Sequence, residues 1–346
     1  MLTKGRWNAI TDVPAVKVGQ VTVDEQVNDV TSIKTGVTAI VPHEGNLFER
    51  KVPAASFVLN GFGKTVGLIQ VNELGILESP IMLTNTFSVP QVLQGTLTYM
   101  LEQNPKIGDS TSSLNIVVGE CNDSYLNSMR EMRITPQHAI EALTTAKTGP
   151  LEQGAIGAGK GMICYEAKGG IGTSSRIVTY DDTHYTVGVL TLTNFGKASE
   201  CKINDWLQLN GYEGRFATFP TKKAPEKPDG SVMIIVATDA PVNERQLQRF
   251  AKRAAIGLGR TGTAVHNGSG DIIIAFSNGY TVPHDANTHI QAYSLLQDQH
   301  PIMNTLFQAV VEATEEAVYQ SLLHAESTTG RNGRIIEQIK LTPPKA

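Results

Sequence analysis

The chain has 346 residues, of which 40% are hydrophobic and 18% are charged, and its formal net charge is -4 at pH 7. This composition is typical of a globular protein with room for one large layered domain or two smaller ones, and the lack of a basic surplus argues against nucleic-acid binding. Three widely spaced cysteines fit neither a disulfide framework nor a thiolate metal site.

The first residues, Met1–Pro14, lack the apolar core of a signal peptide. No stretch of the sequence approaches the ~20 apolar residues that a membrane-spanning helix needs. We therefore expect a cytoplasmic protein that has no membrane partner.

Short apolar runs predict strands in the first third of the chain, at Gly36–Pro42, Ala55–Gly63 and Leu114–Glu120. The first predicted helix is Val89–Gln103, with Ser88 as its N-cap and Pro90 in its first turn. A second helix is expected from the cap Thr135 to Gly149.

Glycines are frequent between Gly154 and Gly172, and one strand, Met162–Ala167, is expected inside this segment. A longer strand, His184–Asn194, follows it. The segment Phe219–Gly230 then has three prolines and three lysines, which predict an exposed connector and the clearest boundary in the chain.

After this connector the expected elements alternate between strand and helix. They are Val232–Thr238, Glu244–Ala255, Asp271–Phe276 and Ile302–Ala325. In the last helix the apolar residues recur at helical spacing, which indicates one face packed against a sheet. Sheets inside and helices outside are the simplest arrangement.

Two glycine motifs resemble nucleotide-binding loops without matching them. Gly154–Gly161 follows the phosphate-loop pattern except that Gly161 stands where a hydroxyl must reach magnesium. Gly257–Gly262 matches the dinucleotide pattern, but a helix precedes it where a strand is required. We interpret the first as a close backbone turn and the second as a helix end.

The histidines form no recognised metal site, because His284 and His289 have no acidic ligand at a suitable spacing. The sequence also lacks the GxSxG and HExxH motifs of common hydrolases. We therefore expect no metal and no cofactor, and we read these histidines as ordinary loop residues.

A serine and a carboxylate stand two residues apart at the start of a predicted strand. Because side chains alternate along a strand, Ser269 and Asp271 lie on the same face and form a usable catalytic pair. A turn in which these side chains bond their own backbone is the more ordinary interpretation of such a motif.

Ser231 opens the most apolar strand, directly after Gly230 and the connector. A serine at this position is usually only a cap. Here, attack of its hydroxyl on the Gly230 carbonyl would leave Ser231 as a new chain terminus, and glycine suits the attacked position because it tolerates strained backbone. The freed α-amine has an ordinary pKa of about 7.7 to 8.0, so it can accept the hydroxyl proton without a histidine.

Several blocks, in order, resemble the DmpA/BapA-type self-processing serine aminopeptidases, which include the L-aminopeptidase D-amidase/esterases and the β-peptidyl aminopeptidases. The blocks are Asn8–Gln20, Thr35–Pro42, Lys168–Val178, Tyr185–Gly196, Gly230–Pro241, Ser269–Ser277 and Ala313–Leu323.

The resemblance implies a role for each site residue. Ser231 matches the nucleophile, and Gly230 matches the residue before the cut, which would divide one layered domain, 1–346, into parts 1–230 and 231–346. Ser269 and Asp271 match a Ser-Gly-acid motif that assists the nucleophile, although the family acid is glutamate, one methylene longer. Asn194 matches an oxyanion-hole asparagine.

Two further positions match residues that face the substrate. Glu120 corresponds to a glutamate that pairs with the substrate ammonium, and Asn122 falls where a backbone N–H completes the oxyanion hole. The implied fold is a four-layer α/β/β/α sandwich, layered like the N-terminal nucleophile hydrolases but connected differently, and assembled as a homotetramer.

The expected activity is therefore removal of N-terminal residues from small peptides, amides or esters with a free amine. Two alternatives remain open on sequence. One is an acyltransferase of the ornithine acetyltransferase type, although that family uses threonine at the cleavage point. The other is an inactive binding protein that keeps the fold without processing.

Overall fold

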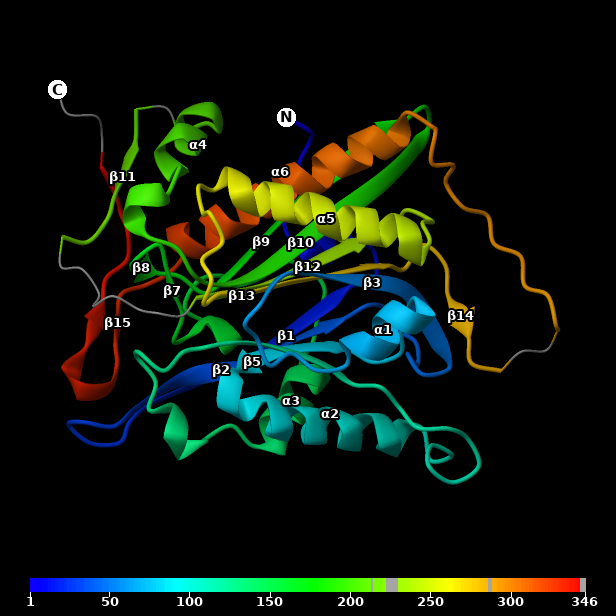
Figure 1. Cartoon of the computed structure of the whole chain (residues 1–346), viewed down its shortest axis with the longest axis horizontal. Helices are drawn as coiled ribbons and strands as arrows, with labels where there is room; N and C mark the ends of the chain where they lie inside the picture. The colour runs from blue at the N-terminus through cyan, green and yellow to red at the C-terminus, as the bar shows by residue number, and fades with distance from the viewer. Residues whose placement is uncertain (213, 222–229, 286–287, 343–346) are drawn as a thin grey trace.

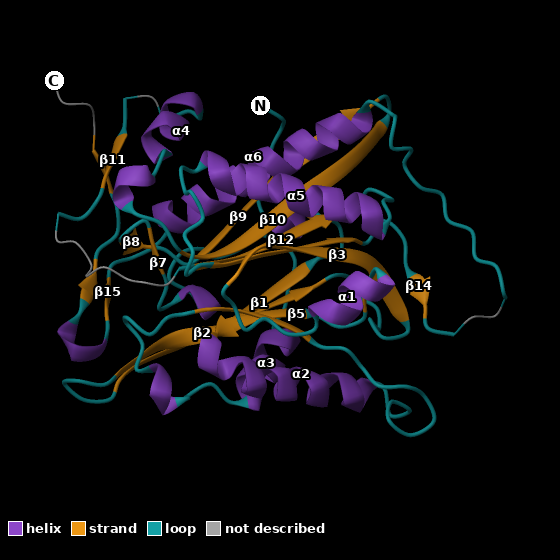
Figure 2. Cartoon of the chain, viewed as in Figure 1, coloured by secondary structure: helices purple, strands orange, loops and turns teal. Residues whose placement is uncertain are grey.

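The computed structural model describes residues 1–212, 214–221, 230–285 and 288–342. Two sheets lie back to back between two outer layers of helices (Figure 1). Helices α5 (Glu244–Arg260) and α6 (Ile302–Leu323) cover the larger sheet, and α2 (Val89–Gln103) and α3 (Pro136–Thr144) cover the smaller one (Figure 2). This is the four-layer arrangement expected from the sequence.

The larger sheet has seven strands in the order β14-β3-β13-β12-β10-β9, with β4 paired to β3. Their bounds are β14 Val282–Pro283, β3 Arg50–Gly61, β13 Gly270–Ser277, β12 Ser231–Thr238, β10 Thr183–Asn194, β9 Ile171–Tyr180 and β4 Ile76–Leu77. Only β12 and β13 pair in parallel within the described part of this sheet. Helix α5 connects them, because parallel neighbours need a crossover.

The smaller sheet has four strands in the order β1-β2-β5-β6. They are β1 Lys17–Gln26, β2 Ser32–Val41, β5 Ile81–Asn85 and β6 Val117–Cys121. Strands β5 and β6 are parallel and α2 connects them, so each sheet contains one strand–helix–strand unit.

The remaining elements are short. They are helices α1 Leu68–Leu74 and α4 Ile203–Leu209, and the strand pairs β7 Ile163–Cys164 with β8 Ala167–Lys168, β11 Phe216–Thr218 with β17 Lys340–Thr342, and β15 Thr328–Thr329 with β16 Ile335–Ile336.

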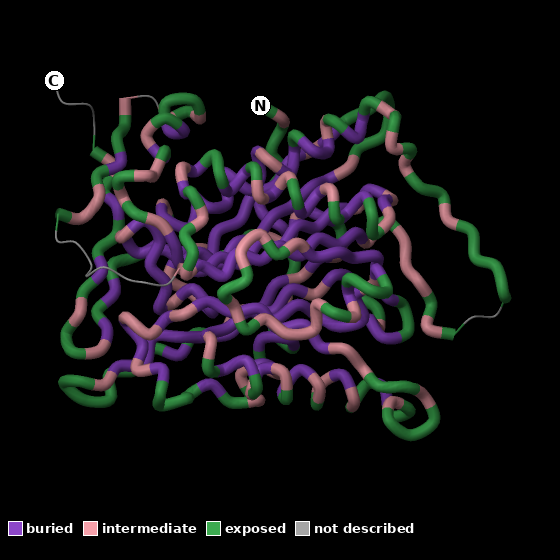
Figure 3. Tube along the Cα trace, in the orientation of Figure 1, coloured by how far each residue is buried: buried purple, intermediate pink, exposed green. Residues whose placement is uncertain are grey.

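The buried core is concentrated in the two sheets (Figure 3). All eight residues of β12 and all eight of β13 are buried. One face of β12 packs on the smaller sheet through Met233 and Ile235, and the other packs on the outer helices through Ile234 and Val236. A strand covered on both faces explains the uninterrupted apolar run in the sequence.

Three sequence expectations need correction. Met162–Ala167 is not one strand, because the backbone turns at Tyr165 (φ 49°) and Glu166 (φ 61°) and separates β7 from β8. The helix expected to reach Gly149 ends at Thr144. Helix α5 continues past Ala255 to Arg260.

The two glycine motifs are explained by close packing. Gly257 lies inside α5, where an added Cβ would meet the Val311 carbonyl oxygen of α6 at 2.6 Å. Gly262, with φ +110°, follows the helix end. In the other motif, a Cβ on Gly159 would lie 2.5 Å from the Ile171 backbone nitrogen. In both motifs, therefore, glycine lets two backbone segments come close together.

The connector expected at Phe219–Gly230 lies, for residues 222–229, outside the described residues. Across the described part of the chain, no helix combines the length and the apolar character needed to cross a bilayer.

Candidate active site

Ser231 lies where three strands of the larger sheet meet. It is the first residue of β12 and pairs in register with Asn194, the last residue of β10. On its other side it pairs with Gly270, the first residue of β13. The pairing therefore gathers the ends of three strands around Ser231, a residue that is 3% exposed.

Two hydrogen-bond donors face the Ser231 hydroxyl oxygen. The backbone N–H of Asn122 donates to Oγ at 3.3 Å, and the side-chain Nδ2 of Asn194 lies 3.5 Å from it. Asn194 is held in this orientation, because Nδ2 also donates to the Asn122 carbonyl (2.9 Å) and Oδ1 accepts from the Ile163 N–H (3.1 Å). An oxyanion formed beside Oγ would have both donors within reach.

Asn122 comes from the other sheet, just after β6. Strand β6 approaches β12 closely because it carries Gly119 at the contact, where an added Cβ would lie 2.5 Å from the Met233 methyl carbon. The candidate site is therefore at the interface between the two sheets, and residues from both contribute to it.

Ser269 and Asp271 form the pair expected from the sequence. The Ser269 hydroxyl donates to Asp271 Oδ1 at 2.7 Å, and both residues are buried. The other carboxylate oxygen, Oδ2, is also buried and has no hydrogen-bond partner among the described residues. Burial raises the pKa of Asp271 from 3.8 to about 6, although the Ser269 hydrogen bond and the nearby His266 oppose the rise.

Gly230 fits its position because little space is left there for a side chain. A Cβ here would lie 3.2 Å from Ser269 Oγ and 3.3 Å from Phe195 Cβ. The Gly230 carbonyl accepts the Gly270 N–H at 3.2 Å, which polarises the bond that Ser231 would attack.

Glu120 and Ser231 line one small pocket of about 40 Å³, together with Phe62, Lys64, Thr86, Asn122 and Gly230. Glu120 is 4% exposed. One of its oxygens accepts the Lys64 backbone N–H at 2.8 Å, and the other accepts the Thr86 hydroxyl. Since each carboxylate oxygen can accept more than one bond, Glu120 keeps capacity for a ligand ammonium.

The structure therefore brings together all seven residues that the sequence singled out. Sequence reasoning missed Phe62, Lys64 and Thr86, which reach the pocket from two other segments, and it missed the Gly270 N–H. No motif marks these positions, because their role depends on which strands become neighbours.

Cys121 adjoins the site, but it is a poor alternative nucleophile. Its thiol is fully buried, and burial with the nearby Glu120 charge raises its pKa far above the ordinary value, so the reactive thiolate is disfavoured. Ser231 is therefore the better candidate.

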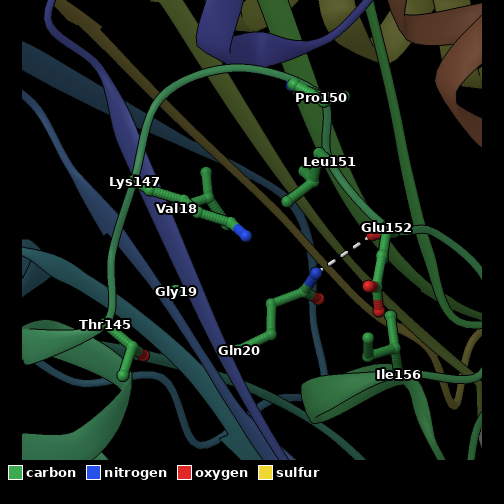
Figure 4. A pocket seen from close by; sticks show the side chains of 9 residues that line it. All are labelled: Val18, Gly19, Gln20, Thr145, Lys147, Pro150, Leu151, Glu152 and Ile156. Atoms are coloured by element: carbon green, nitrogen blue, oxygen red, sulfur yellow. Dashed lines mark hydrogen bonds between the residues drawn. The ribbon is translucent and has the colours of Figure 1, made fainter.

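A larger pocket of about 410 Å³ lies between β1 and the segment that follows α3 (Figure 4). Gln20 donates to the Glu152 carbonyl oxygen at 3.0 Å across it, and Lys147 extends into it. The Thr145 hydroxyl in its lining donates to the Glu141 carbonyl at 2.7 Å, and a backbone carbonyl is not a base that can activate a hydroxyl. Size alone therefore does not identify the reactive site.

Comparison with known proteins gives consistent matches over nearly the whole chain. The profile of the family described as Peptidase family S58 matches residues 8–336. The β-peptidyl aminopeptidase BapA of Sphingosinicella xenopeptidilytica is 38% identical over 344 residues, which cover 95% of this chain and 84% of that protein.

Two solved structures are also similar. The PH0078 protein from Pyrococcus horikoshii OT3 is 43% identical, with a TM-score of 0.87 over 98% of this chain and 92% of that one. The L-aminopeptidase D-Ala-esterase/amidase from Ochrobactrum anthropi is 30% identical, with a TM-score of 0.87 over 98% of this chain and 93% of that one. The latter is described as a new variant of the Ntn hydrolase fold.

Proposed function

The chain belongs to peptidase family S58 and is an aminopeptidase, and on this premise we propose that its nucleophile is Ser231, exposed by self-cleavage after Gly230. The observation that carries the proposal is the position of the Ser231 hydroxyl between two oxyanion donors, at the start of a strand that pairs with the strand carrying the Ser269–Asp271 pair. The family match favours peptide hydrolysis over the acetyl transfer considered above.

Self-cleavage begins with attack of Ser231 Oγ on the Gly230 carbonyl carbon. The Gly270 N–H polarises that carbonyl at 3.2 Å, and the Ser269 hydroxyl lies beside the bond. The C–N bond breaks, the acyl group moves to Oγ, and the departing nitrogen takes a proton. Water then hydrolyses the ester, which gives parts 1–230 and 231–346.

In turnover, the free amine of Ser231 accepts the hydroxyl proton while Oγ attacks the substrate carbonyl. An α-amine has an ordinary pKa of about 7.7 to 8.0, so a useful fraction is neutral at pH 7 to 8. The Asn122 N–H and Asn194 Nδ2 stabilise the oxyanion, and removal of one such donor typically costs about 2.7 to 4 kcal/mol. The leaving amine departs with the proton, and water releases the acyl-enzyme.

Asp271 holds the new terminus in this scheme. Its Oδ2 is buried and has no partner among the residues that the structure describes, and a free α-ammonium on Ser231 would supply a donor and a charge. Aspartate is shorter than the glutamate expected from the family. Asp271 pairs in register with Val232 of β12, so the Asp271 backbone already lies close to that strand. Glu120, which lines the same pocket as Ser231, binds the substrate ammonium.

The substrates we propose are small peptides, amides or esters with a free amine. We also propose a homotetramer of cleaved units, which the family resemblance supports, and a cytoplasmic protein that works without a cofactor, which the sequence patterns support. Sedimentation equilibrium of the purified protein tests the tetramer.

The direct test of the nucleophile is Ser231→Ala, with Ser110→Ala, an exposed loop serine, as control. We expect Ser231→Ala to fold with an unchanged circular dichroism spectrum, to stay one chain on denaturing electrophoresis, and to lose hydrolysis of aminoacyl and β-aminoacyl anilides. The control should cleave and turn over normally. Measurable turnover by Ser231→Ala would assign the nucleophile to another residue.

A further inference from the structure

The pocket around Ser231 is lined by two residues of opposite charge. One is Glu120, which is 4% exposed. The other is Lys64, which is exposed. Ser231 lines the pocket with them.

The Lys64 ammonium is positioned without being neutralised. It lies 4.6 Å from the centroid of the Phe62 ring, a contact that favours a cation over the ring face. Its backbone N–H is tied to Glu120 at 2.8 Å, which fixes the residue at the pocket. Among the residues that the structure describes, no carboxylate comes within ion-pair distance of its Nζ.

A cation with no carboxylate partner beside a reactive hydroxyl is suited to bind an anion. In an unblocked dipeptide the free carboxylate follows the scissile carbonyl by one residue, a distance on the order of 4 Å. The same molecule carries its ammonium on the other side of that carbonyl. Such a substrate therefore carries an ammonium for Glu120 and a carboxylate for Lys64, the two charged residues that line the pocket with Ser231.

We propose that Lys64 is a specificity residue that binds the C-terminal carboxylate of a dipeptide substrate, so that free dipeptides are preferred over their amides. This inference rests on the proposed function of Ser231. Lys64 acts on binding and takes no part in proton transfer. Because the contact is near solvent, it weakens as ionic strength rises.

The test compares a dipeptide with its C-terminal amide, for example β-alanyl-leucine with β-alanyl-leucinamide, and the same pair with an N-terminal L-alanine. The measured quantity is the ratio of kcat/KM for the acid to kcat/KM for the amide, at low and high salt. The variants are Lys64→Gln, which removes the charge, and Lys64→Arg, which keeps it. Lys252→Gln is the matched control, because Lys252 also lies over a phenylalanine ring, Phe57 at 6.0 Å, but not in this pocket.

In the wild type we expect a ratio above one that falls with added salt. Lys64→Gln should lower this ratio on the order of threefold to tenfold, mainly through KM of the acid, whereas Lys64→Arg and Lys252→Gln should keep it. An unchanged ratio in Lys64→Gln would overturn the inference while leaving the proposed function standing. A wild type that cleaves itself but hydrolyses none of these compounds would overturn both.

Discussion

Two buried carboxylates, Glu316 in α6 and Asp271 in β13, are satisfied to different degrees. Glu316 has partners for both oxygens: Lys4 Nζ at 2.6 Å and Asn8 Nδ2 at 2.8 Å on Oε1, and Arg176 Nη2 at 2.7 Å on Oε2. Asp271 has Ser269 on one oxygen and no partner for the other among the described residues. A buried polar group without a partner is costly, so its persistence needs an explanation.

The pKa values of the two groups shift in opposite directions. Burial opposes ionisation of Glu316, but the charge of Arg176 and the bond and charge of Lys4 outweigh it and lower the pKa. Burial raises the pKa of Asp271 to about 6, with too few donors to compensate. The Glu316 carboxylate therefore stabilises the fold. The Asp271 carboxylate is able to bind a cation, and the Ser231 amine would supply one after cleavage.

These shifts give opposite dependences of stability on pH. For Glu316, whose folded pKa is lowered, the stabilisation is present above pH 4.5 and is lost as the pH falls through the folded value. For Asp271, the folded chain retains a proton between pH 3.8 and about 6 that the unfolded chain releases. Its contribution to stability therefore falls as the pH rises across that window.

The largest effect on stability is expected from Arg176→Met, which breaks the buried ion-pair cluster of Arg176, Glu312 and Glu316. Arg176 is fully buried and is bonded to both Glu312 and Glu316, so its loss removes the cation from Glu312 and leaves Glu316 with Lys4 alone. We expect a loss of about 3–5 kcal/mol in the free energy of unfolding. Denaturant titration in the Ser231→Ala background measures it, because an uncleaved chain unfolds as one piece.

The matched control for this change is Lys17→Met. Lys17 also pairs with a glutamate, Glu44 at 3.1 Å, but that glutamate side chain is 67% exposed. Its loss should cost less than about 1 kcal/mol. If Arg176→Met and Lys17→Met lost the same unfolding free energy, the view that the Arg176 cluster stabilises the fold would be contradicted.

A smaller effect is expected from Asp271→Asn in the same uncleaved background. It is a change in the slope of the unfolding free energy against pH. The amide does not titrate, so the decline in stability between pH 3.8 and about 6 should disappear, a difference on the order of 3 kcal/mol across the window. Unfolding free energies at several pH values measure it. If the unfolding free energy depended on pH in the same way with Asp271 and in the Asp271→Asn variant, Asp271 would ionise normally. The proposed contrast between Asp271 and Glu316 would then be wrong.

The sequence predicted the strands and helices whose patterns are strong. Val232–Thr238 and Ile302–Ala325 were expected within a few residues of β12 and α6, because continuous apolar runs and helical periodicity are clear signals. The prediction of one strand at Met162–Ala167 was wrong because Tyr165 and Glu166, residues that rarely adopt positive φ, make a turn there. No turn residue marked it.

The site was predictable where its residues are neighbours in sequence or match family motifs. Ser269 and Asp271 were paired by the strand period alone. The approach of Asn122 to Ser231 depends on β6 facing β12 across the two sheets, and Lys64 reaches the pocket from another segment. Such positions depend on tertiary packing, which a single sequence does not encode locally.

The central claim is that Ser231 becomes a chain terminus, and the mass of the purified wild-type protein under denaturing conditions tests it most directly. We expect two fragments, residues 1–230 and residues 231–346, with N-terminal sequencing of the second reading Ser-Val-Met. A single unbroken chain in preparations that hydrolyse aminoacyl or β-aminoacyl anilides would contradict the account.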